Sequence, residues 1–129
     1  MDLLLDTHVF LWLLSEPERL GNALGSLEDP TNELFLSAAS SWEIAIKTQL
    51  GILELPAEPR RYVPERMRAI GASPLPIEHN HALAVSELPP LHRDPFDRLL
   101  VAQARDLRLR IVTADTQIAR YDVETLMIS

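Results

Sequence analysis

The sequence predicts a three-layer α/β/α fold, in which helices cover both faces of a mostly parallel central sheet. Leu3 to Leu5 form an apolar run that is typical of a short strand buried on both faces, and an acid follows it. Arg110 to Thr113 repeat this arrangement of a short apolar strand with an acid close behind. Between these two runs, strand-like and helix-like patterns alternate, which is the pattern of parallel strands joined by helices.

Length and composition fit one domain covering residues 1–129, since 129 residues with 47% hydrophobic side chains can bury a single core. No apolar run approaches the roughly 20 residues that span a bilayer, and the opening lacks the basic segment of a signal peptide. The chain has no cysteine, which excludes disulfides and thiolate ligands. We therefore expect a cytoplasmic protein without a membrane partner.

The first strand places Asp6 at its carboxyl end, where open α/β sheets bind their ligands. Thr7 and His8 follow, and the apolar stretch from Val9 to Leu14 predicts a helix. The alternative is that Asp6 only caps this helix.

Residues 34–37 predict the second strand. The segment that follows them predicts a helix that ends at Gly51. Glu43 lies in its first turn and is expected to point towards the open edge of the sheet. The alternative is a capping box, in which Ser40 and Glu43 bond the backbone at the helix start. The expected apolar stripe of this helix consists of Trp42, Ala45, Ile46, Gln49 and Leu50.

The middle of the chain predicts a helix over residues 60–70, with Pro64 in its first turn. Residues 73–77 predict an edge strand, because their prolines cannot donate to a neighbouring strand. Residues 78–88 predict another helix.

Asp94 and Pro95 predict the start of a long helix, as N-cap and first helical residue. Asp97 then falls at the third helical position. The simplest explanation of Asp97 is a favourable interaction with the helix dipole. A single acid satisfies that need, however, and this helix start has two, Asp94 and Asp97. Asp115 follows the strand over residues 110–113, a helix is predicted over residues 116–121, and residues 123–128 predict a last edge strand.

Four carboxylates therefore stand at comparable places, beyond strand ends or in first helical turns: Asp6, Glu43, Asp97 and Asp115. If the strands are parallel and adjacent, all four converge on one pocket, where they repel one another. A divalent cation removes this repulsion, and Mg²⁺ or Mn²⁺ prefers such oxygen ligands. A site of this kind activates water and stabilises the charge on a phosphate under attack.

The net charge of −7 argues against a nucleic-acid ligand, because phosphates attract basic side chains. The basic residues are nevertheless unusual, with eleven arginines and one lysine, Lys47. The planar guanidinium suits phosphate as well as carboxylate, although most of these arginines are also explained as a solvated surface.

Four segments resemble the PIN domain, and most of all the VapC-type toxins of bacterial toxin–antitoxin pairs. They span nearly the whole chain in the order and spacing of that family: Leu3-Leu-Leu-Asp-Thr-His-Val-Phe-Leu-Trp12, Ser40-Ser-Trp-Glu-Ile-Ala-Ile-Lys47, His92-Arg-Asp-Pro-Phe-Asp-Arg-Leu-Leu-Val-Ala-Gln-Ala104 and Ile111-Val-Thr-Ala-Asp115.

The resemblance implies a Mg²⁺- or Mn²⁺-dependent endoribonuclease, usually a homodimer, that hydrolyses RNA phosphodiester bonds with metal-activated water. It also implies a VapB-like antitoxin as partner. The family's acidic quartet carries over to the four carboxylates, with Asp6 and Asp97 on the main metal and with Glu43 and Asp115 completing the shell.

Four further residues are expected to support this site. The hydroxyl of Thr113 stands where the family often supports the acids, Asp94 and Thr7 are expected behind the ligands, and Arg98 is a candidate for holding RNA phosphates. The alternatives are another metal-dependent nuclease or phosphatase, and a PIN-like binding module without catalysis.

Overall fold

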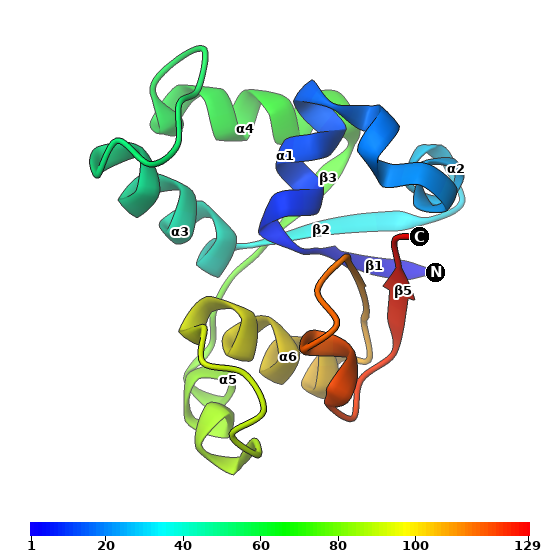
Figure 1. Ribbon diagram of the computed structural model, residues 1–129, viewed down its shortest axis with the longest axis vertical. Coiled ribbons are helices and arrows are strands. Elements are labelled where there is room, and N and C mark those ends of the chain that lie inside the picture. Colours follow the sequence, from blue (N-terminus) through cyan, green and yellow to red (C-terminus); the bar gives the residue numbers. More distant parts are fainter.

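A computed structural model describes residues 1–129, which form a five-stranded sheet with all strands parallel (Figure 1). The order across the sheet is β3-β2-β1-β4-β5, so β1 lies at its centre. The predicted three-layer α/β/α fold is confirmed. The strands are β1 (Asp2–Leu5), β2 (Glu33–Ser37), β3 (Ala72–Leu75), β4 (Arg110–Thr113) and β5 (Thr125–Met127).

Helices connect the strands and lie on both faces of the sheet (Figure 1). None of them combines the length and the apolar composition that a membrane crossing requires. The α-helices are α1 (Thr7–Ser15), α2 (Leu24–Glu28), α3 (Ala38–Gln49), α4 (Pro59–Ile70), α5 (His79–Ala84) and α6 (Pro95–Leu107). The short 3₁₀ helices are η1 (Pro17–Ala23), η2 (Val85–Glu87) and η3 (Ile118–Arg120).

The central strand β1 is buried on both faces, as its unbroken run of leucines predicts. Leu3 and Leu5 pack into one core with α1, η1 and α4, whereas Leu4 packs into a second core with α6. Successive side chains of a strand point to opposite faces, so one short segment contributes to both cores. Figure 1 shows the two helical layers, with α1, α2 and α4 on one side of the sheet and α5 and α6 on the other.

The topology brings the carboxyl ends of β1 and β4 side by side. From β1 the chain crosses to β2 on one side, and it later returns to pair β4 with the other side of β1. The strand order thus reverses between β1 and β4, which is where open α/β sheets form ligand crevices. The N–H of Asp6 donates to the carbonyl of Val112 at 3.1 Å, which fixes Asp6 beside the end of β4.

The buried face of α3 differs from the predicted stripe. Its buried residues are Ala39, Ser40, Glu43 and Ile44, whereas Trp42 is 59% and Leu50 67% exposed. The indole of Trp42 packs edge-on against the ring of Phe96 at a centroid distance of 5.3 Å. Ser40 and Glu43 share the inner face of this helix with Ala39 and Ile44, so the hydrophobic pattern indicated the wrong side.

Two smaller predictions also need correction. Pro64 lies inside α4 rather than in its first turn, because the helix begins at Pro59 and takes Glu58 as N-cap. The segment after Asp115 forms only the 3₁₀ turn η3, not a helix over residues 116–121. Both predicted edge strands, β3 and β5, are present.

Candidate metal centre

An open pocket of about 370 Å³ lies at the carboxyl ends of β1 and β4. Three of the four predicted acids line it, together with His92, which the sequence had not singled out. Glu43 does not line this pocket but lies behind it in α3. The lining residues are Asp6, His8, Trp12, His92, Asp94, Asp97, Ala114 and Asp115.

Asp6 is buried with 4% of its surface exposed, and it occupies the N-cap position of α1. Its side chain makes no capping bond, which argues against the capping explanation. Instead its Oδ2 accepts a 2.6 Å hydrogen bond from the hydroxyl of Thr113. Burial raises the pKa of Asp6, and the negative charges of Glu43 and Asp115 add to this rise. The hydrogen bond from Thr113 opposes it.

Asp97 enters the pocket from the first turn of α6. The carboxylate of Asp94 caps that helix by accepting the N–H groups of Phe96 and Asp97, at 2.8 and 3.3 Å. The predicted helix start at Asp94 and Pro95 is therefore confirmed. Burial, followed by repulsion from Asp6 and Asp94, raises the pKa of Asp97 to about 8.

Asp115 is more exposed and lies beyond the end of β4. Its own N–H donates to the hydroxyl oxygen of Thr113 at 3.0 Å, so Thr113 links the two acids that follow β1 and β4. Partial burial favours a higher pKa for Asp115, but hydrogen bonds from His92 and from the N–H of Gln117 lower it below the usual range.

Glu43 is almost completely buried, with 2% of its surface exposed, and both of its oxygens are bonded. Oε1 accepts the hydroxyl of Thr7 at 2.7 Å, and Oε2 lies 2.6 Å from the Lys47 ammonium. The helix begins at Ala38 with Ser37 as N-cap, so Glu43 belongs to the second turn and forms no capping box. The bond to Glu43 raises the pKa of Lys47. Thr7 and Lys47 thus hold this carboxylate behind the pocket.

His92 lies between two of the pocket acids. Its Nε2 is 2.8 Å from Oδ2 of Asp115 and 3.0 Å from Oδ2 of Asp97. The only sequence signal was its place two residues before Asp94, in a loop whose position no local pattern specifies. Folding of that loop over the strand ends decides this contact.

Arg98 points away from the acids. Its guanidinium donates to the carbonyls of Val85 and Pro89 at 3.0 and 3.1 Å, and to the Tyr121 hydroxyl at 3.2 Å. These bonds fasten α6 to η2, to the loop before α6 and to Tyr121 directly after η3. The predicted contact of Arg98 with RNA stays a prediction.

The donor set fits a hard divalent cation. The pKa values of Asp6 and Asp97 are raised because burial and neighbouring carboxylates oppose their charge, and a cation among these oxygens would remove that opposition. One carboxylate oxygen of Asp97 lies within 4.8 Å of one of Asp115, so both can face the same cation, and Nε2 of His92 lies between them. Oxygen donors without any thiolate favour Mg²⁺ or Mn²⁺ over softer metals.

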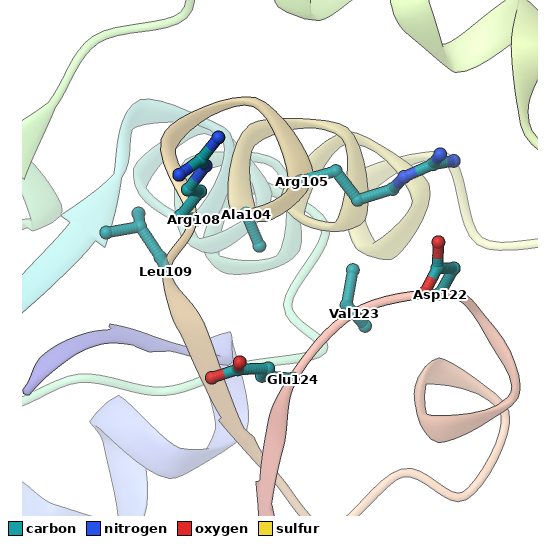
Figure 2. A pocket seen from close by; sticks show the side chains of 7 residues that line it. All are labelled: Ala104, Arg105, Arg108, Leu109, Asp122, Val123 and Glu124. Carbon is teal, nitrogen blue, oxygen red and sulfur yellow. The ribbon is translucent and has the colours of Figure 1, made fainter.

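A second hollow, of about 290 Å³, lies at the opposite end of the strands (Figure 2). It is formed by the end of α6 and the segments that enter β4 and β5, and its charged lining residues are Arg105, Arg108, Asp122 and Glu124. Its charges are mixed and it contains no predicted site residue. The acidic pocket at the carboxyl ends therefore remains the candidate site.

The family model described as "PIN domain" matches residues 3–124. Ribonuclease VapC22 of Mycobacterium tuberculosis is 30% identical over 118 residues, covering 89% of this chain and 88% of that protein. Ribonuclease VapC16 of the same organism is 51% identical over 55 residues, a match that spans 43% of this chain and only 39% of that protein.

Among solved structures, the crystal structure of VapBC2 from Rickettsia felis, bound to a DNA fragment from its promoter, contains a similar chain. The TM-score is 0.74 with 14% sequence identity, and the alignment covers 100% of both chains. At this identity the likeness concerns the fold.

Proposed function

The chain belongs to the VapC-type ribonucleases of the PIN-domain family, and we propose that it is the metal-dependent endoribonuclease toxin of a toxin–antitoxin pair. The family membership rests on matches that span almost the whole chain. The observation that carries the proposal is the convergence of Asp6, Asp97 and Asp115, from three separate segments, on one pocket at the carboxyl ends of the strands.

Asp6, Asp97 and Asp115 are the residues proposed to hold Mg²⁺ or Mn²⁺, with Glu43 behind them. When bound, such a cation supplies activated water and offsets the charge that develops on a phosphate under attack. The hydroxyl of Thr113 orients Asp6 and receives the N–H of Asp115, so it keeps the acids after β1 and β4 in register. Thr7 and Lys47 hold Glu43 in a fixed orientation.

The side chains of one pocket wall favour RNA as the substrate, despite the net charge of −7. Trp12 and His8 line the pocket from α1, and their rings lie 6.0 Å apart. The guanidinium of Arg19 lies 4.2 Å from the centre of the Trp12 ring. Aromatic and cationic groups together suit the stacked bases and phosphates of a single strand.

The proposed partner is a small VapB-like antitoxin, since the similar solved structures include VapBC and FitAB complexes. An acidic pocket presents a negative field that suits an arginine fork, so inhibition is expected to depend on a basic side chain of the partner. A homodimer and a cytoplasmic location, where cellular RNA is accessible, complete the proposal. Alanine replacement of each basic residue of the partner in turn tests the first point, and full inhibition by every variant would refute it.

The direct test is cleavage by the purified protein with Mg²⁺ or Mn²⁺, and with EDTA as the metal-free control. We expect cleavage of single-stranded RNA, but not of duplex DNA or of a phosphate monoester. Cleavage of duplex DNA would favour another nuclease, and release of phosphate from the monoester would favour a phosphatase. No turnover of any substrate at saturating metal would favour a non-catalytic binding module.

A further inference from the structure

We propose that His92 competes with the divalent cation: in the metal-free protein its imidazole N–H lies between Asp97 and Asp115, and the ring must leave when the cation binds. This inference rests on the proposed function only in requiring that these acids bind a cation. It goes further by assigning a regulatory role in the same site to a residue outside the acidic quartet.

The hydrogen bonds of His92 specify which nitrogen carries its proton. The backbone N–H of Asp94 donates to Nδ1 at 3.1 Å, so Nδ1 presents its lone pair. In the neutral ring the proton is then on Nε2, the atom that faces both carboxylates at 2.8 and 3.0 Å. The imidazole therefore acts as a donor to the acids, in a position where a cation would face the same oxygens.

The same tautomer prevents His92 from serving as a metal ligand in this position. Coordination through Nε2 needs a lone pair on that atom, which requires the proton to move to Nδ1. Two N–H groups, those of Nδ1 and Asp94, would then oppose each other at 3.1 Å. The ring can instead move away while its backbone stays anchored, because the N–H of His92 donates to the Tyr121 hydroxyl at 2.9 Å.

The charges around His92 explain why its N–H, in the place of a cation, stabilises the metal-free site. Asp97 and Asp115 both point an oxygen at the ring, and Asp6 adds a third carboxylate in the same pocket. Lys47 is already paired with Glu43. The His92 N–H thus faces Asp97 and Asp115 together, and these contacts must break before a cation can take its place.

The experiment is a titration of the full chain with Mn²⁺ alone, without RNA, followed by calorimetry or by the Mn²⁺ electron-spin resonance signal. We expect His92→Ala to bind Mn²⁺ about tenfold more tightly than the wild type, because the cation no longer displaces a hydrogen-bonded ring. The matched control is His81→Ala. His81 also accepts a backbone N–H at Nδ1 and faces a carboxylate with Nε2, but it lies outside the pocket, so its removal should leave Mn²⁺ affinity unchanged.

A second measurement uses the wild type only, and so does not depend on a variant that folds. Nitrogen NMR of the ring should show the Nε2–H tautomer of His92 in the metal-free protein. Addition of Mg²⁺ should remove the hydrogen-bond signature of this N–H without producing a metal-coordinated nitrogen.

Four results would overturn the inference. Weaker Mn²⁺ binding by His92→Ala would make His92 a ligand, as would an Nδ1–H ring that appears with Mg²⁺. Equal Mn²⁺ affinity of the wild type and His92→Ala would remove only the proposed competition. Absence of Mn²⁺ binding by both proteins would remove the metal-dependent function and the inference with it.

Discussion

His81 and His92 form the same local arrangement in two different surroundings. Each accepts a nearby backbone N–H at Nδ1, at 3.1 Å, and each turns Nε2 towards a carboxylate. His81 meets one acid, Asp106 of α6, at 3.0 Å. His92 meets two acids, at the sheet edge where further carboxylates converge.

The difference shows that the surroundings, not the histidine, separate a structural contact from a candidate site. His81 is 3% exposed, and its contacts close the N-terminus of α5 and tie that helix to α6. Asp106 is partly solvated, and it is the one acid that His81 contacts. At His92, by contrast, burial and the negative charges of Asp6 and Asp94 raise the pKa of Asp97 to about 8.

The largest expected effect is on RNA cleavage, and it separates the acids of the pocket from the acid beside His81. Asp6→Asn should reduce metal-dependent RNA cleavage by at least about a hundredfold, because the amide keeps the shape but loses the charge proposed to hold the cation. Asp106→Asn should cleave like the wild type. Rates measured with one single-stranded RNA at saturating Mg²⁺ decide this, together with circular dichroism to show that both variants fold. Wild-type cleavage by Asp6→Asn would refute its assignment.

Divalent metal should stabilise the acidic region specifically. At a metal concentration about 100 times its dissociation constant, the free energy of unfolding should rise by about 2.7 kcal/mol, because the unfolded chain has no assembled site. Thermal melting in Mn²⁺ or Mg²⁺ against EDTA measures the shift, and Asp6→Asn should show much less of it. An unchanged melting temperature at several millimolar metal would count against the site.

Removal of the His81 side chain should lower the free energy of unfolding more than removal of the His92 side chain. His81→Ala should lower the free energy of unfolding by about 2 kcal/mol, since it leaves a buried cavity and breaks both the helix cap and the tie to α6. His92→Ala should lower it by about 1 kcal/mol or less, because the freed acids face an open pocket. Urea unfolding in EDTA compares the two, and the reverse order would contradict the division of roles.

The smallest effect is the pH dependence of the metal-free protein. With its pKa at about 8, native Asp97 binds a proton that the unfolded chain releases near pH 4. The native state therefore holds more protons between these values, and the free energy of unfolding should fall as pH rises through this window. Solvent access to the pocket limits the expected loss to about 1 kcal/mol between pH 6 and 8.

Asp97→Asn should flatten this slope, whereas Asp106→Asn should keep it. Urea unfolding at a series of pH values in EDTA provides the measurement. A stability that rises with pH over the same window in the wild type would show that the carboxyl of Asp97 is not held protonated.

The sequence predicted the strands and the acids that follow them because both are local features. Leu3 to Leu5 are apolar at every position, which is required when helices cover both faces of a strand. Asp94 and Pro95 start α6 through bonds within three residues of each other, so their pattern needs no knowledge of the rest of the fold.

The helix α3 shows where local pattern fails. Hydrophobic periodicity assumes that apolar side chains face inward, yet Glu43 and Ser40 occupy the inner face and Trp42 the outer one. Burial of Glu43 depends on Thr7 of α1, 36 positions away, and on Lys47 one turn later in α3. The partner that makes this burial favourable cannot be found from the helix alone.

The sequence by itself thus determined the order of the elements, the parallel sheet and the positions of the acids along the chain. Only the tertiary structure decided which polar groups meet: Thr113 with Asp6 across 107 positions, and His92 with Asp115 across 23. The physical reason is that hydrophobic runs and helix caps depend on neighbours in sequence. A hydrogen bond between side chains depends on atoms brought within about 3 Å by the packing of the whole chain.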